Sequence, residues 1–257
     1  MLTVDLHVHS LFSACGLHTI LELIEQGRKI GLAAMAITDH GLAVGNGRLT
    51  SVFFERFKCP FSDIVLYKGI ELNLLDDKGT IDIVWQFMPF IDILLLGVHP
   101  NLPPRGSREH YTAMLCAAID KYPFIDIITH PNDPAYPLDY LRIANKAKEY
   151  GIALELNNSK VHYNRSTAED ALELVDACKQ TGCCMAVNSD THALLELGCD
   201  DAVRPLLDRA RFPADRIVNR DLDSAAAFIA GRRGLKKEAI LRHNRVGGKR
   251  QGRSNGA

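Results

Sequence analysis

The stretch VDLHVHS, residues 4–10, carries the pattern of a buried strand with chemically active side chains. Aliphatic residues alternate there with Asp5, His7 and His9. Side chains two residues apart in a strand point to the same face, so the two histidines can share one metal ion. The stretch therefore predicts a strand that ends at a metal site.

Six further apolar runs follow this one and alternate with helical patterns, which is the arrangement that βα units and a parallel sheet produce. The seven predicted strands span residues 4–9, 34–40, 65–72, 93–99, 125–130, 152–156 and 184–192. Several are almost continuously apolar, as expected for strands that are buried on both faces. The pattern predicts an α/β fold with a closed or well-covered parallel sheet.

Helices are predicted between the strands and after the last one. Apolar residues at 20, 23 and 24, followed by glycine at 27 and 31, indicate a helix that ends before the second strand. Further helices are predicted near residues 111–121, 138–150, 168–180 and 219–231. Ser166 and Glu169 have the spacing of a capping box for the helix at 168.

The composition favours one large domain, because 257 residues with 47% apolar content can bury a full core. We expect this domain at residues 1–235 and a C-terminal extension at 236–257 with a largely disordered, Gly-, Arg- and Lys-rich tail. Lys and Arg (30) almost balance Asp and Glu (31), so the charge gives no reason to expect a nucleic acid or a membrane as partner.

The cysteines favour a reducing compartment. There are seven of them, scattered and including the adjacent Cys183 and Cys184, and this does not resemble a secreted disulfide framework. No apolar stretch approaches the roughly 18 residues of a membrane span. We therefore expect an unprocessed cytoplasmic protein, and the sequence leaves open whether it forms a homo-oligomer.

Potential metal ligands lie at or just past the carboxyl ends of six of the seven predicted strands. They are His7 and His9, Asp39 and His40, Glu71, His99, His130, and Asp190 with His192. In a parallel α/β barrel these ends share one face, where the active sites of such barrels are built. Asp39 is expected to orient His40 or a neighbour, and Asp5 either supports the site or is a strand-edge acid.

Imidazole and carboxylate, with at most one thiolate, suit Zn, Mn or Fe better than Mg or Ca. The ligands are enough for two or three divalent ions, with Zn favoured, if Glu71 bridges. The resulting positive charge favours a dianionic substrate, and hence a small-molecule phosphate ester. A polynuclear site supplies a metal-bridging hydroxide as nucleophile and Lewis-acid stabilisation. The predicted catalytic core is His7, His9, Glu71, His99, His130 and Asp190.

Six short motifs resemble those of the PHP (polymerase and histidinol phosphatase) superfamily, and more closely those of its YcdX-like stand-alone phosphatases. They are DLHVHS (5–10), AITDHG (36–41), GIELN (69–73), GVHP (97–100), ITHP (128–131) and NSDTH (188–192), and the similarity extends to about residue 232. The resemblance implies a distorted (βα)7 barrel, similar to a TIM barrel, with a trinuclear metal site and phosphoesterase activity.

The same resemblance implies how the ligands are divided between the ions. His7, His9, Glu71 and Asp190 would hold one ion, Glu71, His99 and His130 a second, and His40 with His192 much of a third. Asn157, Asn158, Ser159 and Arg165 would be candidates to touch phosphate, because arginine binds it in bidentate fashion. A solvated loop position is the alternative for Arg165.

The chain departs from this family in the loop after the first strand. Where the family has a further histidine, this sequence has Cys15, and His18 follows three residues later. A Cys15 thiolate would replace the imidazole and bias the third site toward zinc. The alternatives are that His18 completes the site or that the third site is weak.

Other functions remain open at this point. Histidinol phosphate is the alternative substrate within the same reaction class. Amidohydrolases also carry His-x-His on the first strand of a barrel, but they typically add a carboxylated lysine at a middle strand end, where this chain has His99. A non-catalytic PHP module is the third possibility, although such a module usually loses ligands that this chain retains.

Overall fold

The seven strands form one parallel sheet that curls into a nearly closed barrel. The computed structural model describes residues 1–44, 48–100, 102, 103 and 105–251, the last six of them by their backbone alone. The order in the sheet is the order in the chain. The strands are β1 (Val4–Val8), β2 (Ala34–Ile37), β3 (Val65–Asn73), β4 (Ile93–Gly97), β5 (Ile127–Ile128), β6 (Ala153–Asn157) and β7 (Met185–Asn188).

Contacts between the first and last strands close the barrel. Val8 pairs with Thr191 in a parallel bridge just beyond β7. The His9 backbone N–H donates to the Thr191 carbonyl at 2.9 Å. The predicted seven-stranded βα barrel is confirmed, and each predicted strand coincides with an observed one. Two observed strands end one residue later than predicted, β3 at Asn73 and β6 at Asn157.

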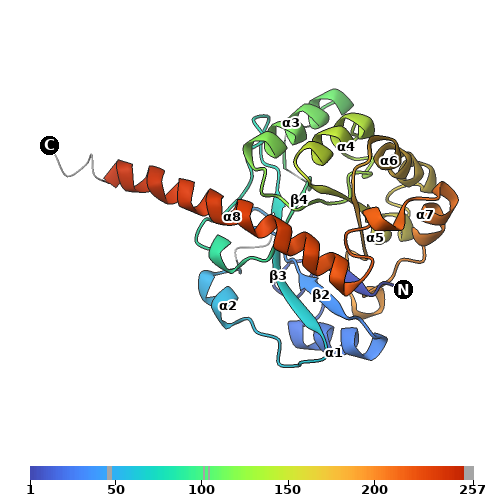
Figure 1. Ribbon diagram of the computed structural model, residues 1–257, viewed down its shortest axis with the longest axis horizontal. Coiled ribbons are helices and arrows are strands. Elements are labelled where there is room, and N and C mark those ends of the chain that lie inside the picture. Colours follow the sequence, from blue (N-terminus) through green and yellow to red (C-terminus); the bar gives the residue numbers. More distant parts are fainter. Residues whose placement is uncertain (45–47, 101, 104, 252–257) are drawn as a thin grey trace.

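The helices surround this barrel (Figure 1). They are α1 (Ile20–Ile30), α2 (Ser51–Arg56), α3 (Arg108–Lys121), α4 (Tyr140–Glu149), α5 (Asn158–His162), α6 (Ala168–Thr181), α7 (Arg204–Ala210) and α8 (Leu222–Gln251), with 3-10 turns at Met88–Phe90, Leu194–Glu196 and Ala214–Arg216. The start of α1 has a capping box, and Gly31 ends the helix in the left-handed conformation that glycine adopts readily.

Among the described residues, no helix combines the length and the apolar character that crossing a membrane requires.

The capping box of α6 lies one residue later than predicted. Thr167 is the N-cap, and its side chain and that of Asp170 satisfy each other's backbone N–H groups. Ser166 is occupied elsewhere, because its hydroxyl exchanges hydrogen bonds with the Asn132 side chain and carbonyl. The prediction of Ser166 with Glu169 is therefore wrong in register, although the helix begins where it was expected.

Helix α8 covers the end of the barrel opposite the carboxyl ends of the strands. Its Ala225 and Ile229 pack with Val4, Leu6 and other small or aliphatic residues of the barrel interior. Further along the helix, Arg232 and Lys236 both form ion pairs with the fully buried Asp126, which precedes β5. This end of the barrel is thus a closed, ion-paired plug.

The same helix corrects the prediction for the C-terminus. The closing helix was expected to stop near residue 231, and residues 236–257 were expected to be largely disordered. Instead α8 continues to Gln251, and Figure 1 shows its second half projecting beyond the barrel. Lys236 is buried in the plug, so a boundary at residue 235 would cut through packed structure. Residues 252–257 lie outside the described part of the chain.

Candidate metal centre

The carboxylate of Glu71 lies at the middle of the histidine cluster. Strand β3 carries it to the mouth of the barrel, where it is fully buried. Its Oε1 lies 3.3 Å from His99 Nε2 and 3.1 Å from His130 Nε2. Its Oε2 lies 2.9 Å from His40 Nδ1, 3.4 Å from His7 Nε2 and 3.5 Å from His9 Nε2. One carboxylate with imidazoles on both oxygens has the arrangement of a bridge between two cations.

His7 and His9 aim ring nitrogens at the same point. His7 Nδ1 lies 2.8 Å from a Glu155 oxygen, and a carboxylate accepts, so this nitrogen carries a proton. In the neutral ring Nε2 then presents a lone pair. His9 Nδ1 lies 3.1 Å from the Ser13 hydroxyl, whose proton is donated to Asp39, so His9 also presents its Nε2. The two Nε2 atoms are 3.0 Å apart. Two lone pairs this close fit a shared positive ion.

Asp190 completes this side of the cluster. Its Oδ1 lies 3.3 Å from His9 Nε2, 3.5 Å from His7 Nε2 and 3.7 Å from His192 Nδ1. Together with Glu71 it gives the buried pair of histidines two acidic partners. This set of nitrogen and oxygen atoms is the donor chemistry of a Zn, Mn or Fe site.

Several buried atoms of the cluster have no hydrogen-bond partner among the described residues. They are His40 Nδ1, Glu71 Oε2 and both ring nitrogens of His99. Buried polar atoms are rarely left unpaired, because each one costs about 1–3 kcal/mol. Imidazole nitrogens lie 2.9–3.5 Å from Glu71 Oε2 although this oxygen has no hydrogen-bond partner among the described residues, which fits bound cations at these atoms.

The electrostatics of the cluster favour added positive charge. Burial disfavours a charged imidazole, yet Glu155, Glu71 and Asp190 raise the pKa of His7 well above its ordinary value. Burial also opposes ionisation of Glu71, but His99 and His7 hold the pKa of this carboxyl well below its usual range. For His9, burial and the neighbouring His40 lower the pKa, which leaves a neutral imidazole that can ligate.

Glu155 positions the cluster, although it is not among the site residues that the sequence predicts. It is fully buried on β6, where its carboxylate accepts from the His7 ring, the His130 backbone N–H and two asparagine side chains. Fixing the far nitrogen of a ligating histidine in this way is the usual task of a supporting carboxylate. An acid within the apolar run ALELN was the signal in the sequence.

Asp39 supports the loop after β1 rather than contacting His40 through its own side chain. It accepts hydrogen bonds from the backbone N–H and hydroxyl of Ser10 and of Ser13. Ser13 in turn accepts from the His40 backbone N–H. Asp5 has a comparable task, because it accepts from Ser189 and from Gly198 in the segment after β7. Both acids therefore hold ligand-bearing segments in place.

The backbone is strained where two predicted ligands lie. His130 and Asp190 have φ angles of 33° and 56°, in the left-handed region that residues with a side chain seldom adopt. Gly97 permits a further close approach, since a Cβ there would lie 2.6 Å from the His99 ring and 2.9 Å from Glu71 Oε1. Strain of this kind concentrates at functional sites.

A second group of possible ligands lies at the outer edge of the cluster. Cys15, His9, His40 and His192 offer ligand atoms that all lie within 4.8 Å of one another. Burial would raise the pKa of the Cys15 thiol, but His192 and His40 outweigh it and lower this pKa to about 7. His18 belongs to none of the ligand groups found among the described residues, so the geometry favours Cys15 at this position.

Comparison with known proteins identifies the family. Residues 5–159 match the PHP domain. The chain belongs to the PHP family. A probable phosphatase of Shewanella sp. (strain MR-4) is 33% identical over 242 residues, 93% of this chain and 95% of that protein. A probable phosphatase of Caldicellulosiruptor bescii is 30% identical over 230 residues, 89% of this chain and 95% of its own length.

Solved structures share the barrel of this PHP protein at low sequence identity. Histidinol phosphate phosphatase from Lactococcus lactis, complexed with zinc, L-histidinol and phosphate, aligns with a TM-score of 0.55 and 15% identity, over 82% of this chain and 94% of that one. A chain of an archaeal ribonuclease P complex with mature tRNA aligns with a TM-score of 0.58 and 16% identity, over 90% of this chain and 92% of that one. At these identities the comparisons show a common fold alone.

The residues predicted to touch phosphate in the PHP site, Asn157, Ser159 and Arg165, lie in three different environments. Asn157 is fully buried, and its side chain donates to Glu155 and Asp190 and accepts from the Lys160 backbone. These bonds make it a support for the ligands and argue against a contact with phosphate. Ser159 lies beside a cavity of about 120 Å³ that also borders Ser189. Arg165 is exposed.

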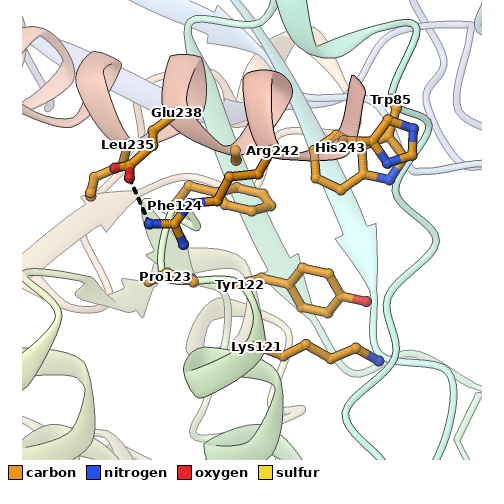
Figure 2. A pocket seen from close by; sticks show the side chains of 10 residues that line it. Trp85, Lys121, Tyr122, Pro123, Phe124, Leu235, Glu238, Arg242 and His243 are labelled. Atoms are coloured by element: carbon orange, nitrogen blue, oxygen red, sulfur yellow. Dashed lines mark hydrogen bonds and ion pairs between the residues drawn. The ribbon is translucent and has the colours of Figure 1, made fainter. Parts of the chain in front are cut away.

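Three other histidines of the PHP chain, His110, His162 and His243, lie outside the cluster. His110 faces Asp77, and His162 faces Asp201. His243 stacks on Trp85 with ring centroids 4.3 Å apart, in a hollow of about 420 Å³ between α8 and the turn before β5 (Figure 2). That turn leads into the amino-terminal end of β5, so this hollow and the metal cluster lie at opposite ends of the barrel.

Proposed function

We propose that this chain is a phosphomonoesterase whose barrel mouth holds two or three divalent ions, with zinc favoured and manganese or iron as alternatives. PHP membership and relatives named probable phosphatase support a metal-dependent hydrolase of phosphate esters. The observation that carries the proposal is the Glu71 carboxylate, which faces imidazole nitrogens through both of its oxygens. A carboxylate so placed fits a polynuclear centre.

The chain's own residues divide into those that would hold ions and those that position them. We assign His7, His9, Glu71 and Asp190 to one ion, Glu71, His99 and His130 to a second, and Cys15, His40 and His192 to an outer third. His9 also lies within reach of the outer group, and His40 within reach of Glu71 and His99. Bound ions supply an activated water-derived nucleophile at neutral pH and stabilise charge on the phosphoryl oxygens. Glu155 and Ser13 keep the protons of His7 and His9 on Nδ1, away from the ions.

The substrate is proposed to be a small phosphate ester that enters from the loops after the strands. Ser159 and the exposed Arg165 follow β6 at this end of the barrel and are the proposed phosphate contacts. Histidinol phosphate is the alternative substrate to test first, since a solved neighbour of the same fold is a histidinol phosphate phosphatase. The leaving group is left to a substrate panel.

The test is metal content per chain, on protein purified without chelator, together with hydrolysis of an aryl phosphate before and after chelation. We expect two or three ions and activity that chelation abolishes and added metal restores. Glu71→Gln is expected to lose both, whereas Glu149→Gln, which changes an exposed acid on α4, keeps both. Fewer than two ions and no turnover would overturn the proposal and favour a non-catalytic module.

The same assay separates the competing reaction class. An amidohydrolase would favour C–N bonds such as those of amides over aryl phosphate monoesters. We expect the reverse, and a diester such as bis-aryl phosphate should be a poorer substrate than the monoester.

A further inference from the structure

The outer ligand group differs chemically from the two inner sets. The inner sets combine imidazole nitrogens with the oxygens of Glu71 and Asp190. The outer group contains the sulfur of Cys15 and imidazole nitrogens, with no carboxylate among its members. Thiolate and imidazole together select zinc, whereas carboxylate-containing sets also accept manganese and iron.

The loop that carries Cys15 is held in place from both sides. Before it, Ser13 bonds to Asp39 through its backbone N–H and its hydroxyl. After it, the Leu17 backbone N–H donates to the His192 carbonyl at 3.0 Å. Gly16 packs so closely on the Ser10 carbonyl that a Cβ at this position would clash. The sulfur is therefore fixed between the segments that bear His40 and His192.

The distances suit one tetrahedral ion. Zinc binds sulfur at about 2.3 Å and imidazole at about 2.0–2.1 Å, which places tetrahedral ligands roughly 3.3–3.8 Å apart. The outer atoms already lie within 4.8 Å of one another, so small side-chain rotations complete the shell. His40 borders both sets: its Nδ1 lies 2.9 Å from Glu71 Oε2, and one of its ring nitrogens also lies within 4.8 Å of the Cys15 sulfur.

We propose that Cys15, His40 and His192 form a thiolate-containing site that takes zinc in preference to manganese. The centre then combines two kinds of site: an outer one with a sulfur ligand, and inner ones with imidazole and carboxylate ligands. This inference rests on the proposed function only in that both require metal at the barrel mouth. The thiolate would also remove one positive charge from the outer ion, which weakens its pull on a phosphate.

Cobalt substitution tests the ligand directly. Metal is removed with a chelator, folding is checked by circular dichroism, and Co²⁺ is titrated while the sulfur-to-cobalt charge-transfer band is recorded. We expect a band that Zn²⁺ displaces. Cys15→Ser should lose the band and one ion per chain, while Cys15→His should lose the band and keep the ion. Cys199→Ser, at a thiol outside the ligand groups, should keep both.

Selectivity is tested by protection of the thiol from alkylation, followed by mass spectrometry of the peptide that contains Cys15. Saturating Zn²⁺ should slow iodoacetamide at least about tenfold, because a ligated thiolate is a poor nucleophile, and Mn²⁺ less than about twofold. Cobalt bound without the band, or equal protection by both metals, would overturn the proposal. A charge-transfer band in a protein without phosphatase activity would uphold the thiolate site and refute the proposed phosphatase. Phosphatase activity in a protein without the band would uphold the phosphatase and refute the thiolate site.

Discussion

Replacing Glu155 with glutamine should weaken metal binding although Glu155 touches no substrate. In the structure all four partners of this carboxylate donate: the His7 ring and Asn188 to Oε1, and the His130 backbone N–H and Asn157 to Oε2. Glutamine keeps the shape but turns one oxygen into a donor. Whichever way the amide points, its NH₂ group faces two other donors.

The size of the effect follows from which pair loses its acceptor. If the NH₂ group faces His7, the ring must move its proton to Nε2, the atom that would ligate. Changes of this kind cost 10–100-fold in metal affinity or activity, or about 1.4–2.7 kcal/mol. If it faces His130, a buried backbone N–H is left unpaired. The Asn157 amide, which donates to the same oxygen, is the second donor without an acceptor. Two unsatisfied donors should lower the free energy of unfolding by about 2–6 kcal/mol in total.

The assay must separate the loss of metal from the loss of stability. Metal affinity is measured by chelator competition, kcat/KM with an aryl phosphate at saturating metal, and stability by denaturant unfolding. Asp126→Asn is the matched control, since it weakens the buried ion pairs with Arg232 and Lys236 at the other end of the barrel. It should lower stability by about 3–5 kcal/mol and leave metal affinity unchanged. A folded Glu155→Gln variant with both wild-type metal affinity and wild-type stability would refute the reasoning.

Three further predictions use other features of the site. Gly97→Ala should lower metal content and activity at least about tenfold, because its Cβ would collide with His99 and Glu71, whereas Gly231→Ala, which has open space on α8, should leave both unchanged; metal analysis decides. Chelation should lower the thermal midpoint, since ions that bind only the folded state stabilise it, and calorimetry that finds no shift after verified metal loss would contradict this. In metal-free protein, alkylation of Cys15 should rise with pH around a midpoint of about 7, because its thiolate is the reactive form, and a midpoint near the ordinary value of 9.0 would contradict it.

The gathering of these side chains at one end of the barrel was predictable because it depends on local pattern and strand direction. A parallel strand delivers its last residues to one face of the barrel, so a histidine or acid at the end of each apolar run could be assigned to a common site. The observed strands β1, β4 and β7 end within a few residues of His9, His99 and Asp190, as those runs indicate. The same pattern of apolar runs therefore predicts both the barrel and the position of the cluster.

The features that were missed depend on contacts distant in sequence. The register of the α6 cap is ambiguous locally, because Ser166–Glu169 and Thr167–Asp170 have the same spacing, and Asn132 decides between them by occupying the Ser166 hydroxyl. The glycines near residue 231 suggest an end to the last helix, but Arg232 reaches Asp126, 106 residues earlier, and carries the helix onward. No local pattern contains such information.

The two ends of the barrel perform different physical tasks, and this separation explains how the mouth tolerates its strain. Left-handed φ angles at His130 and Asp190 cost roughly 1–3 kcal/mol each, and unpaired buried atoms around Glu71 add to that cost. The interior strands and the α8 plug supply stability away from the ligands. Bound ions would offset the rest by pairing the unsatisfied atoms. A stabilising change in the plug should therefore preserve metal affinity, whereas one that relaxes His130 should raise stability and weaken metal binding.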